Sequence, residues 1–414
     1  MKVLSIVNNN VVRDARVQKE ARSLMEAGYE VVVVGVQDRL HLPLTESLGG
    51  IQVVRIPRTG LYAAIWRLFS QDSPAKASAN ESNHPKKTSW KLRIKEWWIP
   101  FHRERVFANF YAGAAARIRH ESPDILHIHD LNALPVLDLL TEVKAKVIYD
   151  AHELYTELAT LRPSQRRSYQ KIESRLIGKA DAVITVNQSI ATELSERYGI
   201  KEPVVVRNCP RTVQKNMKSC IQLREQLAIP SEEKVILFQG GFTKGRGIET
   251  LLEAMVGMEG AQLVLMGWGP LEQELKGLSY RLGLPGKAHF IPPVSQDELI
   301  AVSAQADIGV IPYQAIGLNN YYTSPNKLFE YIHAGLAIAG SDYPELKRVL
   351  NHYQIGELFD PMKAESMRDV LQGMVQDEQK IAAYKLNTVK AATELNWETE
   401  AAVLLNTYVE LGKR

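Results

Sequence analysis

The stretch Glu30–Val36, EVVVVGV, decides the fold class of this chain. A strand with one face in water alternates apolar and polar side chains, and this stretch does not alternate. Strands of this kind are typically buried on both faces, as in a parallel sheet that is covered by helices on both sides. An amphipathic segment at 15–27 separates it from the first apolar run, KVLSIV. We therefore predict that the chain begins with a strand–helix–strand unit.

The same pattern continues outward from Val36. The runs IQVVRI, ILHIH, AKVIYD, DAVITV and PVVVRN follow, with helical segments between the last few of them. The pattern then starts again at KVILFQ and continues through AQLVLMG, AHFI, DIGVIPY and LAIAG. Repeated strand–helix units predict doubly wound α/β domains, whose ligands bind at the carboxyl ends of the strands. The predicted fold is thus two doubly wound Rossmann-like domains facing a central cleft.

The domain boundaries are predicted from length and from the loss of apolar periodicity. A chain of 414 residues favours two domains. We predict an N-terminal domain over 1–206, interrupted by an insertion at about 58–105, and a C-terminal domain over 207–396. A final amphipathic helix at 397–414 is expected to pack back toward the N-terminal domain.

The composition is that of an ordinary globular protein, with 45% hydrophobic and 23% charged residues. A net charge of +3 is far from the composition of a nucleic-acid-binding protein, so we expect no nucleic-acid partner. Two cysteines fit neither a disulfide scaffold nor a zinc cluster. No apolar run is long enough to span a bilayer, which leads us to expect a cytoplasmic protein.

The segment 86–105 is basic and rich in aromatic residues. It carries seven Lys and Arg residues against two Glu, with Trp90, Trp97, Trp98 and Phe101 between them. Such a segment suits the anionic surface of a membrane or a lipid acceptor. A solvated helix whose aromatic side chains pack on their own domain explains the pattern equally well, and both interpretations stay open.

A glycine-rich stretch, GGFTKGRG, follows the strand KVILFQ and precedes a helix. Glycines such as Gly240 and Gly241 allow backbone amides to approach a phosphate, and Lys244 and Arg246 add positive charge. The stretch is neither a Walker loop nor a GxGxxG motif. It predicts a phosphate-binding loop, with a mobile basic loop as the alternative.

Three further stretches of the second half mark strand ends. Gly267 lies in a second glycine turn, MGWGP, and two prolines before Val294 would hold the backbone there rigid, as a site for a flat base requires. In SPNKLFEYIHAG, 324–335, Lys327 and Glu330 share a short apolar helix. Buried charged side chains need a partner, which is either the other member of this pair or a ligand.

Polar side chains also follow strands in the first half. His152 comes directly after one strand, and His129 and Asp130 come after another. A lone histidine on an apolar strand is more often a core residue, but two at the ends of strands favour a site. Asp14 and Arg16 open the first helix, where Asp14 is explained as a helix cap and Arg16 is not.

These stretches together resemble the retaining nucleotide-sugar glycosyltransferases of family 4, which have the two-domain GT-B fold. The resemblance rests on KVLSIVNNNVVRDARVQKEARSLMEAGYEVVVVG, DILHIHDLNALPVL, AHELY, ADAVITVNQSIATELSERYG, FQGGFTKGRGIETLLEAM, LMGWGP and SPNKLFEYIHAGLAIAGSD. It covers the chain except for the insertion.

The resemblance implies roles for the residues before and on the helix of SPNKLFEYIHAG. Relatives often carry two glutamates seven residues apart, of which Glu330 is the second and would bind the ribose hydroxyls. The first position is Tyr322, which is not an acid. Contacts to the donor sugar would then fall to Thr323, Ser324 or the main chain before Asn326.

The implied activity is transfer of a sugar from a nucleotide-sugar to a hydroxyl acceptor with retention, in cell-envelope or exopolysaccharide biosynthesis. The acceptor would be lipid-linked or a polysaccharide, and the protein would work on the inner face of the cytoplasmic membrane. No Asp-x-Asp pair occurs, so neither a metal nor a cofactor is expected. The expected catalytic residues are His152 and Glu330, with Asp14, Arg16, His129 and Asp130 on the acceptor side and Gly240, Gly241, Lys244, Arg246, Gly267, Val294, Thr323, Ser324, Asn326, Lys327 and Glu330 on the donor side.

Three other functions remain possible at this point. A nucleotide-sugar epimerase can share the fold and would need no acceptor. A catalytically silent nucleotide-sugar-binding protein would agree with the missing acid at Tyr322. A membrane scaffold built on the basic segment would need no intact nucleotide site.

Overall fold

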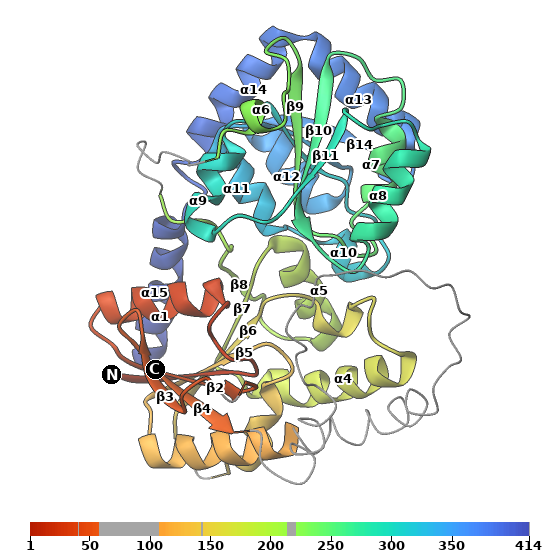
Figure 1. Cartoon of the computed structure of the whole chain (residues 1–414). Coiled ribbons are helices and arrows are strands. Elements are labelled where there is room, and N and C mark those ends of the chain that lie inside the picture. Colours follow the sequence, from red (N-terminus) through yellow and green to blue (C-terminus); the bar gives the residue numbers. More distant parts are fainter. Residues whose placement is uncertain (40, 58–106, 142–143, 213–220, 414) are drawn as a thin grey trace. The chain divides into compact units, whose positions relative to one another are not determined.

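The computed structural model describes residues 1–39, 41–57, 107–141, 144–212 and 221–413. The chain divides into two compact units (Figure 1). Unit 1 comprises Met1–Asp150 and Lys171–Val183, and unit 2 comprises Ala151–Gln170 and Ile184–Arg414. The predicted insertion at about 58–105, with its basic segment 86–105, lies outside the described residues.

The first sheet has eight strands in the order β3-β4-β2-β1-β5-β6-β7-β8. Its strands are β1 (Lys2–Val7), β2 (Glu30–Gln37), β3 (Thr45–Leu48), β4 (Ile51–Pro57), β5 (Ile125–His129), β6 (Lys146–Ala151), β7 (Ala182–Thr185) and β8 (Val204–Val205). The stretch EVVVVGV lies in β2, which is buried from Val31 to Val36 and pairs in parallel with β1 and β4. The prediction made from that stretch is confirmed, and β3 is added as an antiparallel edge strand.

The second sheet has six strands, all paired in parallel, in the order β11-β10-β9-β12-β13-β14. The strands are β9 (Lys234–Gly241), β10 (Ala261–Trp268), β11 (Ala288–Ile291), β12 (Ile308–Ile311), β13 (Ala337–Ser341) and β14 (Gly356–Phe359). The predicted pair of doubly wound α/β sheets is therefore confirmed.

Helices connect the strands in both sheets (Figure 1). A helix covers 107–121, and three short 3-10 helices occupy Leu134–Leu139, Tyr155–Glu157 and Ile177–Lys179. The labelled helices are α1 (Ala15–Glu26), α4 (Pro163–Leu176), α5 (Gln188–Tyr198), α6 (Leu223–Gln226), α7 (Ile248–Ala254), α8 (Glu272–Arg281), α9 (Gln296–Ser303), α10 (Leu318–Tyr321), α11 (Asn326–Ala334), α12 (Pro344–Tyr353), α13 (Ala364–Gln376), α14 (Glu378–Ala391) and α15 (Trp397–Gly412). Among the described helices, none combines the length and the apolar composition that a bilayer crossing requires.

The second sheet is buried on both faces, and β10 shows this directly. Leu263 and Leu265 enter one apolar cluster together with side chains of α7, α8 and α13. The intervening Val264 and Met266 enter a second cluster with side chains of α9, α11 and α12. Because successive side chains of a strand point to opposite faces, the two clusters cover opposite faces of the sheet. In an open parallel sheet of this kind, ligands bind at the carboxyl ends of the strands.

Candidate active site

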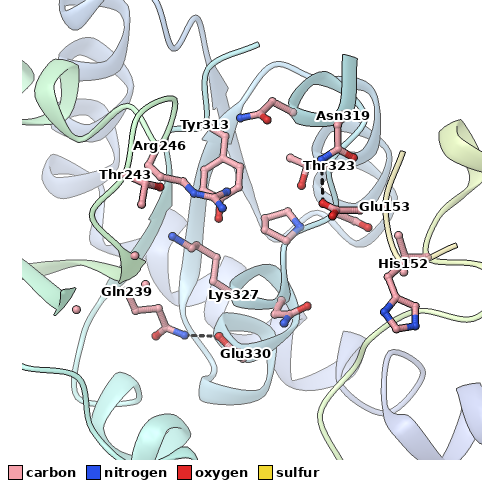
Figure 2. A pocket seen from close by; sticks show the side chains of 18 of the residues that line it. His152, Glu153, Gln239, Thr243, Arg246, Tyr313, Asn319, Thr323, Lys327 and Glu330 are labelled. Atoms are coloured by element: carbon pink, nitrogen blue, oxygen red, sulfur yellow. Dashed lines mark hydrogen bonds between the residues drawn. The ribbon is translucent and has the colours of Figure 1, made fainter. Parts of the chain in front are cut away.

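A pocket of about 950 Å³ lies in unit 2, and all residues that line it belong to that unit. Its walls come from the segment after β6, the start of α5, the β9–α7 loop, the carboxyl end of β10, the Pro293–Val294 turn, and the segment from Tyr313 through α11 (Figure 2). Most of these are segments that follow a strand, which is where open parallel sheets bind ligands.

The structure brings all the predicted donor-side residues to this pocket. Those that line it are His152, Gly240, Gly241, Lys244, Arg246, Gly267, Val294, Thr323, Ser324, Asn326, Lys327 and Glu330. Their placement in one pocket agrees with the sequence prediction, whereas the role of each side chain stays a prediction.

The glycine loop between β9 and α7 needs glycine for two separate reasons. Gly240 and Gly247 have φ angles of 124° and 68°, which side chains of L-residues rarely adopt. A Cβ atom on Gly247 would also lie 1.8 Å from the carbonyl oxygen of Pro312. The loop can therefore pass close to the segment after β12 only because this position carries no side chain.

Lys327 and Arg246 place two basic side chains at one side of the pocket. The Arg246 guanidinium lies 4.2 Å from the centroid of the Tyr313 ring, and Lys327 Nζ lies 5.0 Å from the same ring. Lys327 Nζ also lies 3.7 Å from the centroid of the Phe238 ring. Lys327 is only 5% exposed, and its Nζ has no hydrogen-bond partner in the described structure. Burial, and then the neighbouring Arg246, lower the pKa of Lys327 well below its usual value, while Glu330 acts in the opposite direction.

Glu330 is held by Gln239, the residue at the end of the apolar part of β9. Gln239 Nε2 donates to Glu330 Oε2 (Figure 2). Gln239 Oε1 accepts from Ser303 Oγ at 2.7 Å. Among the described residues no ion pair joins Lys327 to Glu330, although the two are three positions apart on α11. The two charged residues of SPNKLFEYIHAG thus have different neighbours: Gln239 contacts Glu330, and Lys327 Nζ faces aromatic rings.

Two asparagines that the sequence analysis missed fix the segment before α11. Asn187 Nδ2 donates to the carbonyl oxygen of Tyr322 at 2.7 Å and to Ser324 Oγ at 3.0 Å. Asn319 Oδ1 accepts from the backbone N–H of Leu154 at 2.9 Å. Asn187 directly follows the apolar run DAVITV, so the rule that singled out His152 could have found it.

The predicted acceptor-side residues lie in unit 1, and none of them lines this pocket. Asp14 caps α1, because its Oδ1 accepts from the backbone N–H of Val17 at 3.1 Å. Asp130 follows β5 with a φ angle of 63°, and its backbone N–H donates to the carbonyl oxygen of Asp150. The acceptor roles of these residues stay predictions.

Arg16 and His129 belong to a buried charged cluster in unit 1. Arg16 donates to both carboxylate oxygens of Asp150, at 2.9 and 2.8 Å, and its Nε lies 3.0 Å from Glu20 Oε1. His127 and His129 stack at 4.2 Å beside these carboxylates. Glu20, Asp150 and the two histidines each offer a metal-ligand atom, all within 4.8 Å of one another. Because Arg16 already pairs with both carboxylates, the guanidinium supplies the positive charge that this cluster requires.

The comparisons with known proteins agree with this architecture. Residues 14–209 match the model of the glycosyl transferase 4-like domain, and residues 221–391 match the model of glycosyl transferases group 1. The chain is a group 1 glycosyltransferase. It transfers sugars, and the family resemblance given by its sequence motifs is confirmed.

Relatives of this glycosyltransferase cover most of its length. An uncharacterized glycosyltransferase of Methanocaldococcus jannaschii is 26% identical over 406 residues, which cover 94% of this chain and 91% of the relative. A phosphatidyl-myo-inositol mannosyltransferase of Mycobacterium leprae is 24% identical, covering 69% of this chain and 73% of the relative.

Solved structures share the fold of the glycosyltransferase. Sucrose-phosphate synthase from Thermosynechococcus elongatus matches with a TM-score of 0.77 at 17% identity, over 100% of this chain and 99% of that one. HepE of Anabaena in complex with UDP-glucose matches with a TM-score of 0.72 at 14% identity, over 99% of this chain and 100% of that one.

Proposed function

We propose that this glycosyltransferase takes its sugar from a nucleotide-sugar and transfers it, with retention at the anomeric carbon, to a hydroxyl acceptor. The observation that carries the proposal is the pair of basic side chains, Lys327 and Arg246, in the pocket. Arg246 and Lys327 lie 4.2 and 5.0 Å from the centroid of the Tyr313 ring, beside a glycine loop whose backbone can approach a ligand. A diphosphate is a ligand that matches two adjacent cations and exposed backbone amides.

The other walls of the pocket suit the remaining parts of such a donor. Glu330 offers carboxylate oxygens for ribose hydroxyls, and its contact with Gln239 fixes its orientation. Val294 follows two prolines and offers its backbone to a flat base. Thr323 and Ser324 line the pocket with His152, and we assign these three residues to the donor sugar. The UDP-glucose bound by HepE supports this kind of donor.

In the proposed reaction the bond between the anomeric carbon and the diphosphate oxygen breaks, and a bond to the acceptor oxygen forms on the same face. The proton of the acceptor hydroxyl passes to the departing diphosphate. Negative charge grows on the leaving diphosphate as the first bond breaks. Lys327, Lys244, Arg246 and the amides of the glycine loop would stabilise that charge without having to reorganise. His152 would hold the donor sugar while the bond breaks.

We place the acceptor beside Asp14, Arg16, His129 and Asp130. A lipid-linked or polysaccharide acceptor at the inner face of the cytoplasmic membrane remains our proposal, as does a role in cell-envelope or exopolysaccharide biosynthesis. The Mycobacterium leprae relative is named for a phosphatidylinositol substrate, which supports the lipid-linked choice.

The proposal is tested by a thermal-shift panel of UDP, GDP and ADP together with their common sugar conjugates. A ligand at a hundred times its dissociation constant should stabilise the protein by about 2.7 kcal/mol. The best donor is then incubated with and without a crude lipid or polysaccharide acceptor fraction, and free nucleoside diphosphate is measured. Release that depends on the acceptor supports transfer, whereas conversion of the donor to an isomer without acceptor would make the protein an epimerase. A panel in which none of the nucleotides binds would refute the proposal.

A further inference from the structure

Lys327 carries the most unusual charge in the pocket. It lies in the first turn of α11, where it is 5% exposed, and no hydrogen-bond acceptor contacts its Nζ in the described structure. The side chain points toward the glycine loop, since a Cβ atom on Gly240 would lie 3.3 Å from Nζ. Figure 2 shows Lys327 and Arg246 on neighbouring sides of Tyr313, both directed into the pocket.

The groups around Lys327 do not neutralise an ammonium. Arg246 from the β9–α7 loop repels it, and Phe238 of β9 offers only the face of a ring. Glu330, one turn further along α11, attracts it but forms no ion pair with it in the described structure. Tyr313, after β12, offers no negative charge at ordinary pH, because burial raises the pKa of its hydroxyl. The face of an aromatic ring attracts a buried cation by about 2 kcal/mol. This gain is smaller than the free-energy cost of burying an unpaired ammonium.

A lysine in these surroundings changes its charge when an anion arrives. In the empty pocket burial and Arg246 favour the neutral amine, in agreement with the lowered pKa of Lys327. A diphosphate placed between Lys327 and Arg246 favours the ammonium form of Lys327 instead, because its charged oxygens attract an ammonium and accept hydrogen bonds from it.

We propose that Lys327 takes up a proton from solvent when the diphosphate of the donor binds, so that the cation is formed together with its ion pair. The inference rests on the proposed function, since it requires a diphosphate in this pocket. One proton moves from water or buffer to the Lys327 amine, and no covalent bond of the ligand changes. Donor affinity should therefore rise as the pH falls, by up to about tenfold for each pH unit.

Calorimetry at pH 8 measures this uptake directly. UDP, GDP and ADP are titrated into the protein in buffers whose ionisation enthalpies differ, and the slope of the observed heat gives the protons exchanged. At this pH ordinary histidines and terminal phosphates have released their protons, so they add little to the slope. We expect an uptake that approaches about one proton for the diphosphate that binds, and none for the matching free nucleoside.

Two variants of Lys327 show whether this lysine or another group takes up the proton. Lys327→Met should fold, because it replaces a buried amine that has no hydrogen-bond partner with an apolar side chain of similar length. It should bind the diphosphate more weakly and without proton uptake. Lys327→Arg carries a permanent charge and should likewise show no uptake, even where binding is retained. Tight diphosphate binding without uptake in the natural protein, or uptake that persists in Lys327→Met, would overturn this inference and leave the proposed function standing. Absence of binding by all three diphosphates would overturn the proposed function, and this inference with it.

Discussion

Replacing Arg16 by methionine should destabilise unit 1 strongly. The change removes three close contacts, two to Asp150 and one to Glu20, and keeps most of the length of the side chain. Arg16 is 4% exposed, and the side chains of its partners are 0% and 2% exposed. Two carboxylates would thus be left in the interior without the cation that compensates them.

The magnitude follows from the cost of breaking a buried ion pair. Removing one partner of such a pair typically costs about 3–5 kcal/mol, because the remaining charge stays buried. That loss is comparable with the whole free energy of unfolding of many domains, about 5–15 kcal/mol. We therefore expect the Arg16→Met protein to be partly unfolded in unit 1 at growth temperatures.

Hydrogen exchange read by mass spectrometry measures the effect locally, which matters because a chain with two units need not unfold in a single transition. Peptides from β1, β5 and β6 should exchange much faster in Arg16→Met. Arg175→Met is the matched control, because Arg175 pairs with Asp138 on the surface of the same unit, where solvent screens the pair. Exchange in these strands at the rate of the natural protein would refute the structural role of Arg16 and strengthen its proposed role in acceptor binding.

Three further changes test the pocket. Gly247→Ala should displace the glycine loop and weaken diphosphate binding in calorimetry, because its Cβ would overlap the carbonyl of Pro312. The control is Gly257→Ala, where only backbone strain of about 1–2 kcal/mol arises. Equal losses of diphosphate affinity in the two variants would refute the steric argument. Glu330→Gln should weaken binding of the nucleoside diphosphate by about 1.5–3 kcal/mol but should hardly affect its 2′,3′-dideoxy analogue, and equal losses would remove the ribose role. The pKa of Lys327 is depressed in the folded protein. Between this lowered pKa and the ordinary pKa of lysine, the unfolded state binds more protons than the folded state, so the free energy of unfolding rises with pH. Urea unfolding of Lys327→Met should show a smaller rise between pH 7 and pH 9, and parallel profiles would contradict the lowered pKa.

Local sequence patterns were sufficient to single out stretches that come together at one pocket, whereas the donor-binding role of their residues stays a prediction. The glycine loop, the turn at Gly267 and the stretch SPNKLFEYIHAG each follow a strand or begin a helix, and all of them line one pocket. In a parallel sheet the carboxyl ends of the strands lie at one edge, so residues far apart in sequence meet there once the strands are recognised. Asn187 and Gln239 obey the same rule, and a wider application of it would have included them.

What the sequence could not decide is how charged side chains pair in the interior. The spacing of Lys327 and Glu330 allows an ion pair on one helix, yet β9 offers Gln239 to the carboxylate and a phenylalanine ring to the ammonium. Arg16 looks like a free cation at a helix start, and only the packing of α1 against β6 reveals its two buried hydrogen bonds to Asp150.

The sequence by itself thus determined the two parallel sheets and the stretches that line one pocket, because apolar periodicity and glycine turns depend on neighbours within a few residues. The tertiary structure alone decided which charges are compensated, because that depends on side chains more than a hundred positions away, as with Arg16 and Asp150. A buried charge is stabilised or destabilised by the nearest few atoms, and their identity is settled only when the strands and helices pack together.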